Sequence, residues 1–373
     1  MRLLLIILSQ FLSGAIWFAG NVAFQGQGLL LSAVQAGFIA GTLSFAVLNV
    51  ADRFSPARFF LVSAVLGGMF NAIPLWFEGN DGLLLMSRFA CGICLAGIYP
   101  VGMKIAASWY PDTLGRALGL LVGALVLASG FPYLLKVMSW QGSAAQILGT
   151  TSLLCITGGF IQAFMVGDGP ALPKGSAFNI RAIRDAFAHP GFRAASLGYF
   201  GHMWELYALW AFIPLLFKAL VPGAPDAWTF AFFLVGFMGC SAGGLISLKI
   251  GSRRIASMAL AVSAACCLIS PLFHRIPLPV ALILLMGWGM AVVTDSPQFS
   301  ALNARFAPRA YVGSALTIVN CIGFFITILS IELLDLWISA WGIRYAFLPL
   351  ALGPLFGWLS MHRMPKGITG HND

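Results

Sequence analysis

Charged residues are scarce in this sequence. Asp, Glu, Lys and Arg make up only 9% of its 373 residues, whereas soluble domains carry about 25%. Apolar residues reach 60% even with glycine left out. This composition excludes a disordered chain, a disulfide-stabilised secreted scaffold and an ordinary soluble enzyme. It predicts a polytopic membrane protein.

The sequence also lacks the motifs of cofactor-dependent chemistry. It contains neither a nucleotide-binding Walker string nor the His-Glu-x-x-His spacing of a metalloprotease. Its seven cysteines fall in apolar segments, and the pair Cys91-x-x-Cys94 suits helix packing better than redox chemistry. We therefore expect no enzyme activity, no cofactor and no metal site.

Twelve apolar segments are long enough to cross a bilayer as helices, which requires about 20 residues each. Charged residues, glycine and proline separate them, and most connections are too short for a soluble domain. The sequence therefore predicts an all-α fold of twelve transmembrane helices. The predicted helices cover residues 3–24, 29–50, 59–77, 83–107, 117–138, 145–166, 194–218, 229–248, 255–273, 278–300, 310–333 and 343–361.

The basic residues support this division and orient it. With the N-terminus in the cytoplasm, sixteen Lys and Arg residues fall on the cytoplasmic side, four on the outer side, and Arg88 within a helix. Cytoplasmic loops of membrane proteins carry such an excess of positive charge. The distribution predicts that both termini are cytoplasmic. The four outer residues are Lys136, Lys218, Arg275 and Arg344.

The longest connection lies near the middle of the chain and divides the predicted helices into two bundles of six. Within it, Ile180, Ile183 and Phe187 share one helix face, with Arg181 and Arg184 elsewhere. This pattern is typical of a helix on the membrane surface, and a solvated connector fits it equally well. The predicted parts are an N-terminal six-helix bundle over residues 1–166, a cytoplasmic linker over 167–192, a C-terminal six-helix bundle over 193–362 and a cytoplasmic tail over 363–373.

The two predicted bundles repeat one another in sequence. The fourth and the tenth predicted helices end alike, each with a pair of prolines spaced by eleven residues that begins at Pro100 and at Pro297. The first and seventh helices share a Gly-x-x-Trp string that ends at Trp17 and at Trp204. Two such halves in the same orientation imply a pseudo-twofold axis along the membrane normal, with a central site between them.

Two loops and one predicted helix carry the features of a known family. After the second helix, LNVADRFSPAR keeps Asp52, Arg53 and Arg58 of the pattern Gly-x3-Asp-Arg-x-Gly-Arg-Arg, while its second-half copy, GLISLKIGSRR, has Leu248 in place of the acid. The fourth helix contributes Arg88 in RFACGICLAGIYPVG. With the six-plus-six arrangement, these features resemble the major facilitator superfamily of secondary transporters over the whole chain.

The resemblance implies a secondary active transporter that moves a small solute by alternating access. Its partners would be the solute, protons and the lipid bilayer, with no nucleic acid, and it would work as a monomer in the inner membrane if bacterial. The fifth helix lacks the Gly-Pro-x-x-Gly-Gly ending of drug/proton antiporters, while GYFGHMWELYALW and DSPQFSALN resemble a bacterial branch of the superfamily. An uncoupled facilitator and a membrane sensor or scaffold without flux remain alternatives.

Glu205 lies about 11 residues, or roughly 17 Å, into the seventh predicted helix and so near the middle of the bilayer. His202 precedes it by one turn and shares its helix face. Ionisable groups at this depth are costly and are functional candidates by default. We expect the two side chains to form a proton-coupling pair, with a structural hydrogen bond between helices as the alternative.

Other polar and aromatic side chains at membrane depth are candidates for contact with the solute. Arg88 lies nearer the outer side, where it can attract an anion, hold a carboxylate or extend toward the headgroups. Each of the remaining candidates taken alone is more often a packing residue. The predicted solute cavity comprises Trp17, Asn21, Arg88, Trp204, Tyr207 and Asn320.

Asp295 lies about 17 residues into the tenth predicted helix and so near its cytoplasmic end. Its depth differs from that of Arg88 by about 17 Å, which excludes a direct ion pair between them. Followed by Ser296 and Pro297, it suits either a gate or a plain helix cap. The predicted cytoplasmic gate comprises Asp52, Arg53, Arg58 and Asp295.

Overall fold

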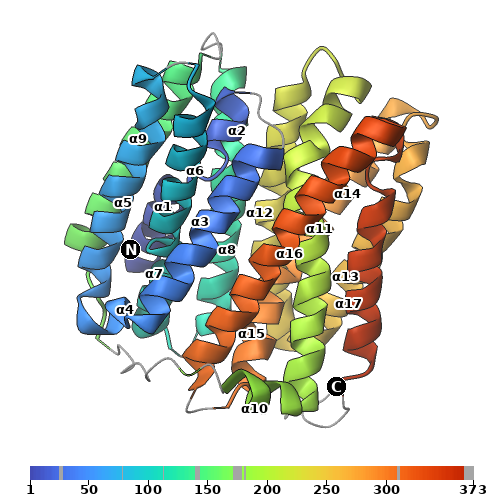
Figure 1. Cartoon of the computed structure of the whole chain (residues 1–373). Coiled ribbons are helices and arrows are strands. Elements are labelled where there is room, and N and C mark those ends of the chain that lie inside the picture. The colour runs from blue at the N-terminus through green and yellow to red at the C-terminus, as the bar shows by residue number, and fades with distance from the viewer. Residues whose placement is uncertain are drawn as a thin grey trace.

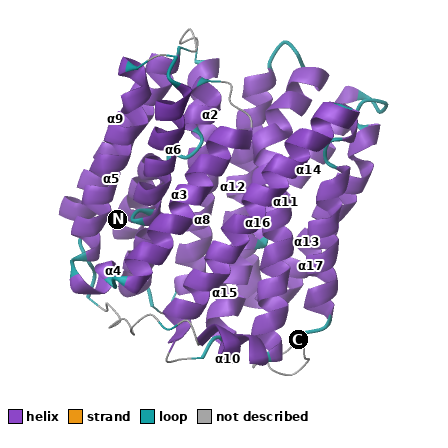
Figure 2. Ribbon diagram, viewed as in Figure 1, coloured by secondary structure: helices purple, strands orange, loops and turns teal. Residues whose placement is uncertain are grey.

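The computed structural model of the chain consists of helices and connecting loops, with no strand among the residues it describes (Figure 2). The helices stand side by side in two bundles (Figure 1). The all-α fold predicted from the sequence is therefore confirmed. The described residues are 1–24, 28–77, 79–111, 113–138, 143–170, 179, 182–308 and 311–364.

The first bundle is formed by the N-terminal part of the chain. A short 3₁₀ helix extends α5 at Ile73–Trp76, and a π-helical segment extends α9 at Ile161–Val166. Its helices are α1 (Arg2–Gly14), α2 (Ala19–Ala23), α3 (Gly28–Val47), α4 (Val50–Arg53), α5 (Pro56–Ala72), α6 (Asp81–Ala96), α7 (Tyr99–Trp109), α8 (Leu114–Val137) and α9 (Ala144–Phe160).

The second bundle is formed by the C-terminal part of the chain. Short 3₁₀ turns lie at Ser270–Leu272, Ile343–Tyr345 and Leu348–Ala351. Its helices are α10 (Ala182–Ala188), α11 (Pro190–Leu220), α12 (Pro225–Ile250), α13 (Ser252–Ile269), α14 (Leu278–Thr294), α15 (Ser296–Phe306), α16 (Val312–Trp341) and α17 (Leu352–His362). We call the end that carries α4 and α10 the linker end, and the opposite one the far end (Figure 1).

Several helices begin where the sequence supplies a capping side chain. Ser55, Asn80 and Ser143 each accept a hydrogen bond from a backbone N–H in the first turn of α5, α6 and α9. His189 does the same for α11, and Pro190 follows it as the first helical residue. Such caps satisfy N–H groups that have no partner within the helix, and proline at the first position loses nothing.

Among the described residues, ten helices or end-to-end helix pairs are long and apolar enough to cross a membrane. The first predicted helix is instead broken into α1, of 13 residues, and the short α2. The last is broken by the turn at Leu348–Ala351, which leaves 11 residues in α17. The count of twelve transmembrane helices and the cytoplasmic location of the termini stay predictions.

The linker forms a helix at its end. α10 covers Ala182–Ala188, and the half-buried Phe187 packs its ring 5.4 Å from that of Phe192 on α11. Ile180, Arg181, residues 171–178 of the linker and residues 365–373 of the tail lie outside the described part of the chain. The predicted domain boundaries and the surface location of this helix stay predictions.

The proline repeat corresponds to a repeated helix break. α6 and α14 both end near mid-length of a longer element, and α7 and α15, each of 11 residues, continue it. Pro100 and Pro297 occupy the first turn of α7 and α15. Proline has no N–H to donate to the preceding turn, so each of these prolines favours a break in the helix at its position.

The tryptophan repeat does not correspond to a repeated geometry. Trp17 lies in a fully buried non-helical turn, residues 15–18, between α1 and α2. Trp204 lies within α11, which runs without interruption from Pro190 to Leu220. Similar strings therefore occupy an unwound segment in the first bundle and a regular helix in the second.

The two bundles contact each other mainly through α8 against α12 and α3 against α16. Small residues permit a close approach between α8 and α12. A side-chain carbon added to Gly119 would lie 3.4 Å from Cα of Gly244 and 3.2 Å from the carbonyl oxygen of Cys240. Close backbone contact of this kind is typical of membrane helices, where packing replaces the hydrophobic effect.

Gly92→Ala is expected to destabilise the first bundle. A methyl group at Gly92 would collide with backbone atoms of Val34 and Phe38 on α3, which can yield only if the helices separate. Overpacking of this kind costs about 1–3 kcal/mol or more. We expect a lower yield and a lower melting temperature in detergent. Gly287→Ala in α14 is the matched control, because its added carbon would meet nothing within 4 Å, and an equal loss in both variants would contradict the expectation.

Candidate functional site

A cavity lies between the two bundles. About 550 Å³ of empty space, part of it open to solvent, is surrounded by α7 and α8 of the first bundle and by α11, α14, α15 and α16 of the second. Two residues of the predicted solute cavity, Tyr207 and Asn320, lie in its wall. The polar side chains of the wall are Tyr99, Tyr199, Tyr207, Ser296, Ser300 and Asn320.

Trp17 stands directly behind this wall. Its ring stacks on the rings of Tyr207 and Phe324, with centroids 5.9 Å and 6.0 Å apart. The side chain is fully buried, and its Nε1 has no hydrogen-bond partner in the described part of the chain. The unwound turn of the first bundle thus supports two residues that line the cavity from the second bundle.

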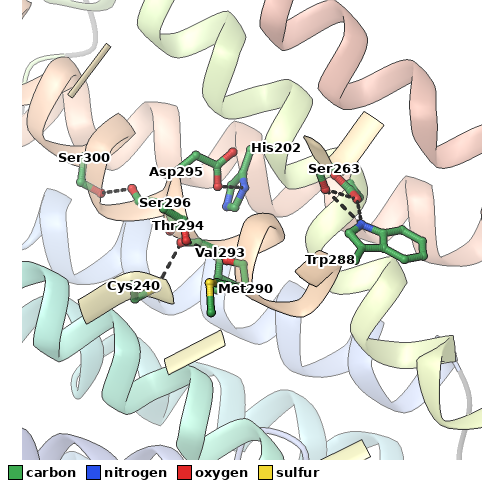
Figure 3. Close-up of polar contacts among 11 residues, drawn as sticks. His202, Cys240, Ser263, Trp288, Met290, Val293, Thr294, Asp295, Ser296 and Ser300 are labelled. Atoms are coloured by element: carbon green, nitrogen blue, oxygen red, sulfur yellow. Dashed lines mark hydrogen bonds and ion pairs between the residues drawn. The ribbon is translucent and has the colours of Figure 1, made fainter. Parts of the chain in front are cut away.

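Glu205 is buried in α11 on the side that faces α13 and α14, with 1% of its surface exposed. Three side chains donate hydrogen bonds to one carboxylate oxygen, Oε1. The donors are Ser263 Oγ at 2.5 Å, Cys267 Sγ at 3.3 Å and Trp288 Nε1 at 2.7 Å. Figure 3 shows Ser263 and Trp288 side by side, where Trp288 Nε1 also lies 3.1 Å from Ser263 Oγ. The carboxylate therefore joins three helices of the second bundle.

His202 and Asp295 form a second buried contact. Nδ1 of His202 lies 2.9 Å from Oδ1 of Asp295, and the two side chains are 1% and 2% exposed (Figure 3). Asp295 occupies the single residue between α14 and α15. Nε2 of His202 has no hydrogen-bond partner in the described chain. The contact thus fastens the middle of α11 to the helix break.

His202 and Glu205 have different partners, and their predicted role as a proton-coupling pair stays a prediction. The i, i+3 spacing places both on the same side of α11, but Glu205 bonds to α13 and α14 while His202 contacts the break between α14 and α15. The helical element that contains Asp295 also extends further than expected. α15 continues for 11 residues after it, so Asp295 lies in the interior of the element and not near its end.

Arg88 is fully buried within the first bundle and does not line the cavity. Its guanidinium donates to the side-chain oxygen of Asn71 at 2.9 Å and to the Asn71 carbonyl at 3.4 Å. The amide nitrogen of Asn71 in turn donates to α9, at Leu148, Thr151 and Ser152. Arg88 thus bonds to a partner in its own bundle.

Two further residues of the predicted cavity lie outside its wall. Trp204 donates from Nε1 to the carbonyl of Pro349 at 3.2 Å, and therefore faces the last helical segment of its own bundle. Asn21 is buried in α2, next to Gly20, which packs against the Arg88 side chain. Both positions suit packing within a bundle better than direct contact with the cavity.

Three residues of the predicted cytoplasmic gate, Asp52, Arg53 and Arg58, lie at the linker end, whereas Asp295 lies in the interior beside His202. Arg53 and Arg58 are exposed near the start of α5, whereas the side chain of Asp52 lies outside the described part of the structure. A different acid, Asp168, contacts the first residues of α5 from the loop after α9. Its Oδ1 accepts hydrogen bonds from Ser55 Oγ at 2.9 Å and from the backbone N–H of Ala57 at 2.7 Å. A carboxylate at a helix N-terminus is stabilised by the helix dipole.

Sequence reasoning missed the partners of the buried charges. Ser263, Cys267 and Trp288 are unremarkable in apolar helices, and only the approach of α13 and α14 to α11 reveals their role. Asn71 gave a weak signal, because an amide in the middle of an apolar helix requires hydrogen-bond partners. Asp168 could have been noticed as an acid directly after the sixth predicted helix, in a loop otherwise dominated by basic residues.

The chain matches the sequence model of the Major Facilitator Superfamily over residues 3–331. A search of curated protein sequences gave no significant match. Similar solved structures are numerous and resemble the chain over nearly its whole length, with low sequence identity.

Three of these structures illustrate the likeness. The transporter FucP in an outward conformation is 14% identical with a TM-score of 0.71, covering 98% of this chain and 99% of its own. The human organic anion transporter MFSD10 (TETRAN) is 14% identical with a TM-score of 0.72, covering 96% and 98%. The proton:xylose symporter XylE, bound to 6-bromo-6-deoxy-D-glucose, is 14% identical with a TM-score of 0.73, covering 98% and 96%. At this identity the likeness establishes the fold.

Proposed function

The chain belongs to the major facilitator superfamily, and we propose that it is a secondary active transporter that moves a small solute by alternating access and couples this movement to protons. One observation carries the proposal. Three ionisable side chains, Glu205, His202 and Asp295, are buried directly behind the cavity wall and at a helix break. Such groups are costly within a membrane and mark proton or ion pathways.

Protonation of these groups can be transmitted to the cavity through α11. A proton on Glu205 removes its charge and weakens the three hydrogen bonds that hold α11 to α13 and α14, because charge-assisted bonds are the stronger ones. A proton shared between His202 and Asp295 similarly controls the contact between α11 and the helix break. Met203, Leu206 and Tyr207, on the same stretch of α11, line the cavity. Proton loading and solute contact therefore act on one helix.

Alternating access requires contacts between the bundles that can break. At the far end, Ser32 Oγ donates to Glu332 Oε1 at 2.6 Å, between α3 and α16. Nζ of Lys136 lies 3.8 Å from Oδ1 of Asp226, between α8 and α12. Both contacts join the two bundles at the far end, and in our proposal they separate when the cavity opens on that side.

Cross-linking Ser32→Cys to Glu332→Cys with a short bis-methanethiosulfonate reagent, which forms a reducible disulfide with each thiol and releases a sulfinate, is expected to reduce transport by about tenfold or more, because a closed far end prevents alternation. Cleavage of the reagent should restore transport. The single variants and the unmodified protein treated with reagent are the controls, since the seven natural cysteines are all buried. Unchanged transport after complete cross-linking would contradict the proposed movement at this site.

Two other functions fit particular observations. All three hydrogen bonds to Glu205 end on one oxygen, which a purely structural carboxylate in an uncoupled facilitator would also show. A membrane sensor without flux would keep the same buried network. In all three cases we propose that the protein lies in the bilayer as a monomer with its linker end in the cytoplasm, which for a bacterial protein is the cytoplasmic side of the inner membrane.

The proposal is tested by proton flux in proteoliposomes that contain a pH-sensitive dye. The vesicles are challenged with pools of small anions, cations and neutral metabolites. A solute-dependent pH change supports coupled transport. Solute exchange without any pH change favours the uncoupled facilitator, and the absence of both pH change and radiolabelled exchange favours the sensor.

A further inference from the structure

The wall of the central cavity contains no group that is charged at neutral pH among the described residues that form it. Its six polar members are phenols, hydroxyls and one amide, and the other members are apolar. The buried ionisable residues Glu205, His202 and Asp295 are not part of the wall and already have partners. Glu205 accepts three hydrogen bonds, and His202 and Asp295 contact each other.

A charged solute would bind weakly in this cavity. An ion that leaves water for an apolar site loses hydration worth several kcal/mol, which only a counter-charge or a full set of hydrogen bonds offsets. Arg88, the residue that the sequence suggested for an anion, bonds instead to Asn71 within the first bundle. Neither an anion nor a cation therefore finds a counter-charge in the cavity.

The neutral polar groups are placed to bind a solute. Tyr99 lines the cavity from α7, and Tyr199 and Tyr207 line it from α11. No hydrogen bond within the described chain occupies these three hydroxyls or the amide of Asn320, and all four side chains line the cavity. Phenol and amide groups can both donate and accept, so together they match a solute with several hydroxyl groups.

Apolar side chains line the rest of the cavity. Trp210, Phe324 and Leu206 contribute aromatic and aliphatic surface to the wall. The ring of Tyr207 packs edge-on against Trp210, with centroids 5.3 Å apart, and Trp17 stacks behind it, so these rings are held in fixed orientations. A rigid aromatic surface favours a solute that has one face of C–H groups.

We propose that the transported solute is an uncharged, polyhydroxylated small molecule with one apolar face, held by the three phenols and the amide. This inference rests on the proposed transport function and names the substrate class of the same cavity. Charge is its discriminating property. Two analogues that differ only in a carboxylate or an ammonium group should therefore differ strongly in their affinity for the protein.

The first test measures binding to the purified full-length protein in detergent. The probes are matched sets of a neutral hexose or pentose, the corresponding uronic acid and the corresponding amino sugar. Binding of each probe is measured by thermal shift and by tryptophan fluorescence. We expect at least one neutral sugar to bind about tenfold or more tightly than both of its charged analogues. Tighter binding of a charged analogue, or no binding by any neutral member, would overturn the inference.

Asn320→Asp tests whether the cavity is the binding site. The substitution is nearly isosteric and adds a carboxylate to the wall. The neutral sugar should bind about tenfold less well, and the amino sugar should gain affinity because it now finds a counter-charge. Asn320→Gln, which keeps the amide, should not produce that gain. If Asn320→Asp changes neither affinity, the cavity is not the site and the inference fails.

Two kinds of flux separate this inference from the coupling proposal. Exchange of labelled neutral sugar across vesicles without a proton gradient reports the substrate class alone. Exchange without proton-driven accumulation would support the substrate class and contradict coupling. Proton-driven accumulation of a uronic acid or an amino sugar would support coupling and overturn the substrate class.

Discussion

Glu205→Gln is expected to abolish proton-driven accumulation while leaving solute exchange within about threefold of the normal rate. Glutamine keeps the shape of the side chain and an oxygen that can accept the hydrogen bonds of Ser263, Cys267 and Trp288. It cannot take up or release a proton. The comparison therefore separates the chemical role of the carboxylate from its packing role, in proteoliposomes assayed for uphill uptake and for equilibrium exchange.

Asp185→Asn is the matched control, because it also neutralises one carboxylate but at an exposed position on α10. It should leave accumulation and exchange unchanged. If Glu205→Gln retains full accumulation, the coupling role of Glu205 is wrong. If it loses exchange together with accumulation while the protein stays folded, the carboxylate is needed for the movement itself, as a structural group would be.

The helices of this protein could be predicted from sequence because membrane helices depend on composition. Apolar runs of about 20 residues form helices whatever their neighbours do, since every backbone group in the bilayer must be bonded internally. The breaks at Pro100 and Pro297 follow from missing N–H groups. The break at residues 15–18 has no such signal, and the matching Gly-x-x-Trp string in α11 remains helical.

The candidate site was predictable only in part. Depth along a helix follows from counting residues, so the burial of Glu205 could be anticipated. Its partners could not, because Ser263, Cys267 and Trp288 approach through packing between helices far apart in sequence. Arg88 shows the same limit. Its position within a helix was expected, but its partner Asn71 lies on a neighbouring helix and holds it within the first bundle.

Asp295 illustrates how a small boundary error changes a functional interpretation. The predicted helix ended at residue 300, and so Asp295 was placed near the cytoplasmic end. The element in fact continues to Phe306, and Asp295 lies level with the middle of α11, beside His202. We therefore propose that Asp295 acts with His202 in coupling and in holding the helix break, in place of the gating role expected from sequence.

A double-mutant cycle of His202→Asn and Asp295→Asn is expected to show strong coupling between the two positions. Removing either partner leaves the other buried without its counterpart, which costs about 3–5 kcal/mol in comparable buried pairs. Removing both leaves two amides that can bond to each other, so the double variant should be less destabilised than the sum of the single ones. Thermal unfolding in detergent gives the stabilities, and proton-driven uptake should be lost in all three variants.

The contact between Lys136 and Asp226 provides the matched control for this cycle. Its two side chains are 23% and 34% exposed and 3.8 Å apart, so Lys136→Gln and Asp226→Asn should show a coupling energy of only about 0–1 kcal/mol. If the His202–Asp295 cycle is no larger than this control, the buried pair does not fasten α11 to the helix break. If the cycle is large but the double variant still accumulates solute with protons, the pair is a structural clamp, and coupling must rest on Glu205 alone.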